Sequence, residues 1–314
     1  MTQWNWLTGW CLAGWLVLAG GMGARAEERE LIQDPGFRGG FHLLVPTPGK
    51  RVVYGDLRAE GATAAPVWDL AQWSSRFPLT PGALTSMGQG TWAVTNTAKV
   101  VRGGGMNADI CLGVNASVEY AGRARQSGAE PWVHLLLQQD FEQPPSLGEL
   151  TACRLKTEVR LRRSELHRTP DYTRDRHAAQ FFIYFIVGNR HEGAADYGRY
   201  YWFGVPVYDD RERRPAAYQA RDFGETGRFI YTPAAERFAR ASVQDGEWVA
   251  FAADLLPLMR SGLAAGHAAG FLPGAADPAD YRIAGVFIGW EVPGLFDVEL
   301  QMRGLSCVAV RAGK

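Results

Sequence analysis

The stretch RYYWFGVPVYDDR, residues 199–211, alternates its side chains in the way that a β-strand requires. Successive side chains of a strand point to opposite faces. One face of residues 200–208 carries Tyr201, Phe203, Val205 and Val207, which is an ordinary apolar core face. The other carries Tyr200, Trp202, Gly204, Pro206 and Tyr208, so that aromatic rings are separated by small residues. The stretch therefore predicts a strand with one core face and one flat aromatic face.

Similar strand-like segments run along most of the chain. They cover residues 51–57, 67–73, 91–101, 110–120, 132–141, 153–161, 179–187, 200–208, 229–232, 248–253, 283–292 and 296–310. Between them lie pieces rich in Gly and Pro, such as DPGFRGG and EQPPSLGE, which end strands for backbone reasons. Many strands with few helical stretches predict an all-β fold, a two-sheet β-sandwich or jelly roll of concanavalin-like or galactose-binding-like type.

One helix is expected in ADLLPLMRSGLAAGHAAG, residues 253–270, because its apolar residues recur at helical spacing. Pro257 belongs in the first turn of such a helix, and Gly262 weakens it. We expect a short peripheral helix that covers an edge or end of the sandwich. No repeat or long linker divides the chain, so residues 27–314 are predicted to form a single β-sandwich domain.

The first 26 residues have the pattern of a secretory signal peptide. An apolar run over residues 7–23 is followed by Ala24-Arg25-Ala26 and then by the charged residues 27–30. The alternative is an uncleaved membrane anchor, but the run is shorter than the roughly 20 residues of a spanning helix. We expect cleavage after Ala26 and a secreted or periplasmic protein with no membrane segment after cleavage.

Charge and cysteine content exclude several classes of function. The 33 basic and 33 acidic residues balance, and no basic stripe is present, so nucleic acid is not an expected partner. Removal of the signal leaves Cys111, Cys153 and Cys307, all in apolar strand-like contexts, which predicts buried cysteines with at most one disulfide. No Cys/His metal spacing occurs, so neither a zinc site nor a cofactor is predicted, and a structural Ca²⁺ is left open. The sequence predicts no particular oligomeric state.

Several other strands also divide into a core face and a mixed polar and aromatic face. In residues 131–139, Trp132, His134 and Gln138 oppose an apolar face, and in residues 283–292 Glu291 opposes Trp290. Aromatic rings stack on the C–H groups of a pyranose, while polar side chains bind its hydroxyls. This combination predicts a carbohydrate-binding face with Tyr200, Trp202, Tyr208, Trp132 and Gln138 as ligand-binding residues. The alternative is that a second layer buries the aromatic residues as well.

Catalysis on this face would need acidic residues. Glycoside hydrolysis uses two carboxyl groups about 5 to 9.5 Å apart, and Glu119 and Glu291 are the candidates because each ends an apolar strand. His134 is the candidate base, for which a hydrogen-bonded core histidine is the alternative. Asp209 and Asp210 follow the aromatic strand and would suit either a structural Ca²⁺ or a solvated turn.

Two short motifs resemble known families of glycan-active β-sandwich proteins. LIQDPGFRGGF, residues 31–41, resembles the opening of many carbohydrate-binding modules, with Asp34 and Arg38 where those modules carry Asn and Glu. RSELHR, residues 163–168, resembles a motif of jelly-roll alginate lyases, with His167 as a departure. The resemblance implies an exported β-sandwich that acts on or binds a glycan.

Three functions follow from these patterns. The favoured function is binding of a polysaccharide or oligosaccharide on the aromatic face. The alternatives are an enzyme on the same scaffold, either a glycoside hydrolase using Glu119 and Glu291 or a polysaccharide lyase using His134 and a tyrosine, and a non-catalytic structural or interaction domain of the cell envelope.

Overall fold

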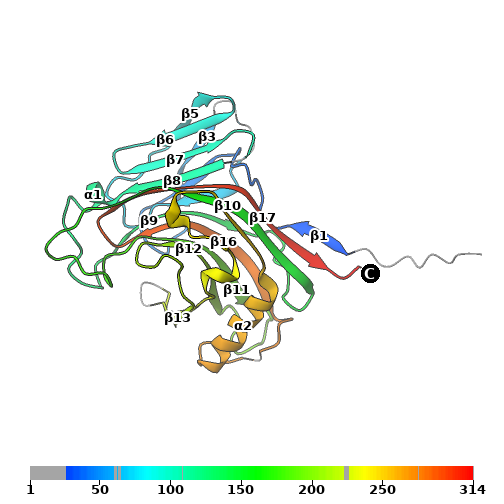
Figure 1. Cartoon of the computed structure of the whole chain (residues 1–314). Helices are drawn as coiled ribbons and strands as arrows, with labels where there is room; N and C mark the ends of the chain where they lie inside the picture. The colour runs from blue at the N-terminus through cyan, green and yellow to red at the C-terminus, as the bar shows by residue number, and fades with distance from the viewer. Residues whose placement is uncertain are drawn as a thin grey trace, which may run out of the picture.

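The computed structural model describes residues 26–59, 62, 65–107, 109–222, 226–274 and 276–313. The predicted signal peptide, apart from Ala26, lies outside the described residues. The strands form two sheets packed face to face, as Figure 1 shows, so the predicted all-β sandwich is confirmed. Within the described residues, no helix is long and apolar enough to cross a membrane.

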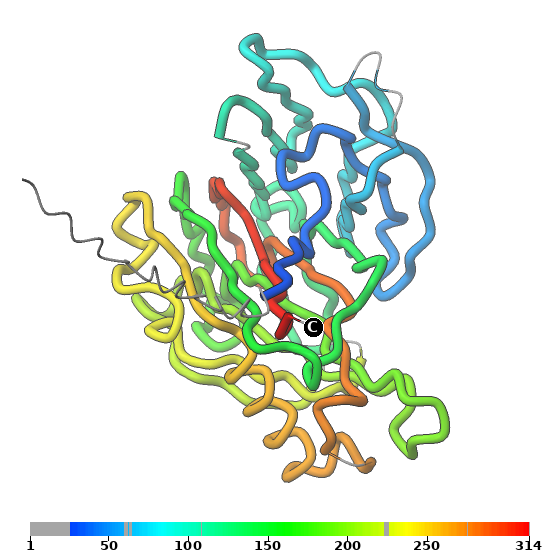
Figure 2. The backbone as a smooth tube through the Cα atoms, turned by 90° about the vertical axis from the view of Figure 1, so that its right-hand side faces the viewer, coloured from blue at the N-terminus to red at the C-terminus, as the bar shows by residue number. Residues whose placement is uncertain are grey.

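The first sheet, sheet A, is antiparallel. Its spatial order is β5 (Gly82–Gly88), β6 (Thr91–Thr95), β7 (Lys99–Gly104), β8 (Asp109–Asn115), β17 (Phe296–Arg311), β10 (Leu150–Leu166) and β15 (Val249–Asp254). The short β1 (Glu27–Glu30) pairs with the last residues of β17. Figure 2 shows these two ends of the described chain side by side, β1 in blue and β17 in red.

The second sheet, sheet B, carries the aromatic strand. Its spatial order is β3 (Val53–Ala59), β2 (Phe41–Leu44), β4 (Trp68–Ala71), β9 (Val133–Asp140), β16 (Tyr281–Val292), β11 (Gln180–Asn189), β12 (Tyr200–Asp209), β14 (Phe229–Thr232) and β13 (Tyr218–Arg221). A parallel pairing between β3 and β5 joins the two sheets along one edge.

The core lies between the sheets and follows the period-two pattern of the sequence. On β12 the side chains of Tyr201, Phe203 and Val205 have no exposed surface, and on β16 the same holds for Ile288 and Trp290. Burial of this apolar area is the main favourable contribution to folding, at roughly 25 cal/mol per Å². The same alternation leaves the other face of sheet B outside the core, and that outer face carries the candidate site.

Helix α2 (Leu255–Ala268) confirms the predicted peripheral helix. Asp254 caps its N-terminus by accepting a hydrogen bond from the backbone N–H of Leu256 at 3.1 Å. Gly262 lets the helix approach sheet B, since a Cβ there would lie 2.9 Å from the Tyr201 ring. The helix therefore covers the side of the sandwich between β10 and β12, at the opposite end of the molecule from β5 to β8 (Figure 1).

The predicted strand over residues 110–120 is wrong at its end. Strand β8 stops at Asn115, and residues 116–119 form the short helix α1 (Ala116–Glu119). Two further short 3₁₀ turns, η1 (Ala235–Arg237) and η2 (Val243–Asp245), precede β15. The change at Asn115 matters for the site because it redirects the side chain of Glu119.

Candidate functional site

A continuous line of rings crosses the outer face of sheet B. We call it the aromatic row, and its members are Trp132, His134, Trp73, Phe287, Trp202 and Tyr200. Neighbouring ring centroids are between 5.2 and 6.3 Å apart. His134 is buried, whereas the other five side chains are partly exposed. The predicted aromatic surface thus exists, and it extends beyond β12 to β16, the start of β9 and the end of β4.

Tyr184 of β11 lies beside this row and packs over Gly204. Its ring centroid is 6.0 Å from that of Trp202. A Cβ at Gly204 would lie 2.8 Å from the Tyr184 ring and 2.6 Å from Thr232 Oγ1. The absence of a side chain at Gly204 therefore leaves room for the ring of Tyr184 next to the backbone of β12.

Tyr208 does not belong to the outer face, contrary to the sequence prediction. A β-bulge shifts the register between β11 and β12, so that Phe181 pairs with Tyr208 while Phe182 pairs with Pro206. The extra residue turns Tyr208 into the core, where its ring packs on Trp290 at 5.6 Å. Its hydroxyl lies 2.7 Å from Ser164 Oγ on sheet A. Tyr208 connects the two sheets and is unavailable to a ligand on the outer face.

Glu291 is the carboxylate beside the Trp132 end of the row. It pairs in register with His134, and its side chain is 26% exposed. The indole N–H of Trp132 donates to Glu291 Oε2 at 3.3 Å, and His134 Nε2 lies 3.8 Å from the same oxygen. The structure therefore brings Trp132, His134 and Glu291 together, and their roles in binding or catalysis stay predictions.

His134 is neutral at pH 7. Burial lowers the pKa of its imidazole to about 4, because a charged ring would lose its hydration. Its Nδ1 atom is buried without a hydrogen-bond partner, and so is the indole Nε1 of Trp73, whose ring centroid lies 5.6 Å from that of His134. Buried polar atoms are normally paired. These two atoms are exceptions, and because they are buried they are closed to a ligand on the outer face.

Gln138 lies further along β9 and takes part in a polar network. Its side-chain N–H donates to Asp69 Oδ2 at 3.1 Å, and Arg51 binds both oxygens of Asp69 at 2.6 and 3.1 Å. Only 8% of Gln138 is exposed. The structure therefore gives Gln138 a role in orienting Asp69, with little surface left for a ligand.

Glu119 has a structural role rather than a place on the outer face. Its carboxylate pairs with the ammonium group of Lys99, and neither side chain has exposed surface. It also accepts hydrogen bonds from Ser75 Oγ at 2.6 Å and from the backbone N–H of Arg76 at 2.7 Å. Because α1 turns this side chain inward, Glu119 cannot serve as the second carboxylate beside Glu291, and that prediction is corrected.

Asp222 is a carboxylate near the site that the sequence did not single out. Burial raises the pKa of the Tyr184 hydroxyl well above its ordinary value, and the charges of Glu291 and Asp222 raise it further. Both carboxylates therefore act on the same hydroxyl. Asp222 also accepts a hydrogen bond from the backbone N–H of Thr226, whose hydroxyl accepts from the Trp202 indole at 3.2 Å. Asp222 lies in a turn without strand periodicity, so no sequence pattern marked it.

The acidic residues after β12 are held by the protein. Asp209 accepts from Arg211 Nε at 2.8 Å and Nη2 at 2.6 Å and from Gln180 Nε2 at 2.7 Å. Although burial acts to raise the pKa of Asp209, Arg211 and Gln180 keep it below its ordinary value. Asp210 accepts the backbone N–H of Ala179 at 2.6 Å, and burial raises its pKa to about 6. The protein thus hydrogen-bonds both carboxylate oxygens of Asp209 and one of Asp210, which does not favour Ca²⁺.

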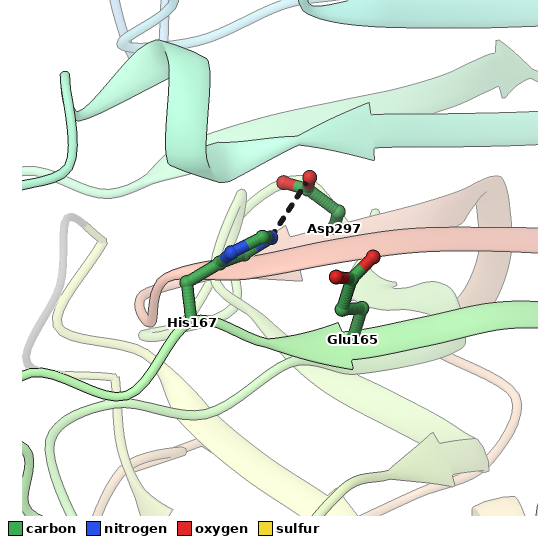
Figure 3. A group of neighbouring side chains, drawn as sticks. All are labelled: Glu165, His167 and Asp297. Atoms are coloured by element: carbon green, nitrogen blue, oxygen red, sulfur yellow. Dashed lines mark hydrogen bonds and ion pairs between the residues drawn. The ribbon is translucent and has the colours of Figure 1, made fainter.

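A second acidic group contains two residues of the RSELHR motif. Figure 3 shows Glu165 and His167 of this segment approaching Asp297 of β17, with their ligand atoms within 4.8 Å of one another. The guanidinium of Arg163 bonds to Glu165 at 2.9 Å and to Asp297 at 2.8 Å, and His167 Nε2 lies 3.0 Å from Asp297. An arginine already occupies the position that a cation would take. The group is an ion-pair network linking β10 to β17.

Comparison with known proteins gives matches among solved structures alone. No protein-family model matches the sequence, and no curated protein matches it. A cellulase derived from the Cel12A enzyme of Rhodothermus marinus is 15% identical, with 78% of this chain and 100% of that chain covered and a TM-score of 0.39. A native family 12 xyloglucanase from Bacillus licheniformis is 8% identical over 72% of this chain and 96% of that chain, with a TM-score of 0.40.

A third match is the xyloglucanase domain of NopAA, a type three effector from Sinorhizobium fredii, in complex with cellobiose. It is 10% identical, with 74% of this chain and 97% of that chain covered and a TM-score of 0.35. At these identities and TM-scores, neither a family nor a residue role follows from the three matches.

Proposed function

We propose that this protein is exported and binds a polysaccharide or oligosaccharide along the aromatic row. The observation that carries the proposal is the unbroken line of six rings across the outer face of sheet B, five of them partly exposed. A glycan chain presents a repeating series of C–H faces, which stack on such rings. A row of rings from β4, β9, β16 and β12 fits an extended ligand better than a single small molecule.

The polar groups beside the row suit the hydroxyls of a sugar. Glu291, whose side chain is 26% exposed, offers an accepting carboxylate at the Trp132 end of the row. Sugar binding combines a large apolar contact with a few fixed polar groups, and the outer face of sheet B has both.

The test is titration calorimetry of the mature chain with a panel of soluble glycans. Replacement of a central aromatic anchor by alanine typically removes about 2 kcal/mol, so Trp202→Ala is expected to weaken binding roughly 30-fold. Trp248→Ala is the matched control, because Trp248 is also partly exposed but precedes β15 of sheet A, where Arg303 stacks on it. If no glycan of a broad panel binds, or if both variants bind as well as the wild type, the proposal is wrong.

Export is tested separately from binding. Expression of the full chain in a bacterial host, followed by fractionation and N-terminal sequencing, should give an extracytoplasmic protein that begins at Glu27. A cytoplasmic chain that retains Met1 would contradict this part of the proposal. Its failure would leave the proposal about the aromatic row intact.

Glycoside hydrolysis is the second candidate, and the position of Glu291 favours it. Glu291 combines a partly exposed carboxylate with the neighbouring rings of Trp132 and His134, and the charges of Glu291 and Asp222 both raise the pKa of the Tyr184 hydroxyl. We propose these two as the carboxylate pair that a hydrolase would require. Glu291→Gln should then abolish turnover while leaving glycan affinity within a few fold. Retained turnover in this variant would exclude Glu291 as a catalytic residue, and a wild-type protein that cleaves no glycan of the panel would exclude hydrolysis.

The lyase alternative has less support. A lyase needs a base that abstracts a proton at neutral pH, and a pKa of about 4 makes the buried His134 a weak base. The raised pKa of Tyr184 keeps its hydroxyl protonated as well. The third alternative, a structural envelope domain, predicts an aromatic row that binds no glycan, and the same panel tests it.

A further inference from the structure

A cavity rich in arginine lies at the Tyr200 end of the aromatic row. It has a volume of about 250 Å³, and its lining includes Tyr200, Phe229 and Phe271. Three arginines, Arg199, Arg221 and Arg228, also line it. This volume is small for a complete drug-sized ligand but sufficient for one substituent of a sugar.

The pairing of three strands brings these arginines together. Arg199 immediately precedes β12, Arg228 immediately precedes β14, and Arg221 is the last residue of β13. Strand β14 runs parallel to β12, with Phe229 opposite Tyr201, and antiparallel to β13, with Phe229 opposite Arg221. The starts of β12 and β14 and the end of β13 therefore meet at one end of sheet B.

The cavity is continuous with the aromatic row. Tyr200 is the last ring of the row and also part of the cavity lining. The guanidinium of Arg228 stacks over the Tyr200 ring, with Cζ 4.9 Å from its centroid. A sugar in contact with Tyr200 would therefore have a guanidinium group within reach of its substituents.

Among the described residues, the three cavity arginines have no ion-pair partner. In the part of the chain that the structure describes, no carboxylate lies within 4.0 Å of a side-chain nitrogen of Arg199, Arg221 or Arg228. Many other arginines do have such a partner, for example Arg211 with Asp209 and Arg51 with Asp69. Gathering three like charges around one cavity is unfavourable unless an anion offsets them.

We infer that this cavity binds an anionic group of the glycan, a carboxylate or a sulfate ester, so that the ligand of the aromatic row is an acidic polysaccharide. The inference deepens the proposed function and rests on it, because a glycan must run along the aromatic row for its anionic group to reach the cavity. The planar guanidinium group binds carboxylate and sulfate oxygens through two parallel N–H donors, which a neutral hydroxyl cannot match. Arg199 and Arg221 are exposed, so the anion can enter from solvent.

The experiment measures binding to matched pairs of oligosaccharides. One pair is an oligogalacturonide and its carboxyl-reduced derivative, and the other is a sulfated oligosaccharide and its desulfated form. The charged member of at least one pair should bind at least tenfold more tightly at low salt, and added salt should reduce that difference. The pair that shows the effect identifies the anion as a carboxylate or a sulfate.

Variants of the arginines connect the effect to the cavity. Arg221→Gln and Arg228→Gln should each remove most of the tenfold preference, and Arg154→Gln is the control because Arg154 is an exposed arginine of β10 on sheet A. Retained secondary structure and an unchanged Tm establish that each variant is folded. Equal binding of charged and neutral members, or an unchanged preference in both cavity variants, would overturn the inference.

Failure of the inference differs from failure of the proposed function. If Trp202→Ala weakens binding of neutral and charged glycans alike and the arginine variants do not, the aromatic row binds glycan and the anionic inference is wrong. If no oligosaccharide binds but free galacturonate or inorganic sulfate does, and Arg221→Gln abolishes that binding, the cavity binds anions and the proposal about the row is wrong.

Discussion

Breaking the buried ion pair between Lys99 and Glu119 is expected to cost about 3 to 5 kcal/mol of folding free energy. Both side chains are fully buried, and the loss of one partner leaves the other as an uncompensated charge in a medium of low polarity. In Lys99→Met the carboxylate retains its bonds to Ser75 at 2.6 Å and Arg76 at 2.7 Å, which places the loss near 3 kcal/mol. This loss is a large fraction of the roughly 5 to 15 kcal/mol by which a typical domain is stable.

The reverse variant, Glu119→Gln, leaves the Lys99 ammonium group with Ser75 Oγ at 3.0 Å. Burial already lowers the pKa of Lys99, and the variant removes the two interactions with Glu119 that oppose this shift. Lys99 should therefore lose its proton more easily, and the variant should gain stability as the pH rises toward the ordinary lysine pKa of 10.5. The double variant Lys99→Met/Glu119→Gln contains neither charge, and its loss should be smaller than the sum of the single losses by at least about 2 kcal/mol.

Urea unfolding at pH 7, analysed by linear extrapolation, measures all four proteins. The reasoning is refuted if both single variants lie within about 0.5 kcal/mol of the wild type. A second refuting result would be a Glu119→Gln variant with unchanged stability that has lost glycan binding or turnover. That outcome would show that Glu119 takes part in glycan binding or turnover.

Three further outcomes are expected. The pKa of His134 is about 4 in the folded protein and 6.5 in the unfolded chain, so between these pH values the unfolded chain binds the proton. The free energy of unfolding should therefore fall by on the order of 3 kcal/mol as the pH falls through this window. His134→Gln should flatten that dependence, as measured by urea titrations at pH 7 and pH 4. Gly204→Ala should displace Tyr184 and lower stability by about 1 to 3 kcal/mol, whereas Gly82→Ala, which has open space around it, should not; equal Tm values for the two variants would contradict the packing argument. The described cysteines, Cys111, Cys153 and Cys307, are all buried, and the thiol pKa values of Cys111 and Cys307 are raised. Ellman's reagent should therefore detect no fast reaction of these thiols until denaturant is added, and a fast reaction in the folded protein would contradict this.

The period-two pattern of the sequence was sufficient for the local geometry. It separated Tyr201, Phe203 and Val205 from Tyr200 and Trp202, and the structure places the first group in the core and the second on the outer face. The reason is that the direction of a side chain in a regular strand depends only on its position along that strand. Helix α2 could be predicted from the sequence for the same reason, since its apolar spacing and its N-cap are local features.

The errors occurred where pairing with distant residues changed the local pattern. Tyr208 left the outer face because a bulge against β11 inserted one residue, and Glu119 turned inward because Asn115 ends β8 and a helix begins. Neither the bulge nor the position of Lys99 can be derived from a window of adjacent residues. A shift of one residue exchanges the two faces of a strand, so small changes in pairing have large effects on a site.

The sequence by itself determined which residues share a face within the regular part of a strand and that the chain forms an all-β sandwich. Only the tertiary structure decided which faces meet. It joined Trp73, Phe287 and Trp202 in one row and brought Arg199, Arg221 and Arg228 to one cavity. Strand order and register are set by contacts between residues far apart in the chain, and no periodic pattern of the sequence indicates which distant residues will meet.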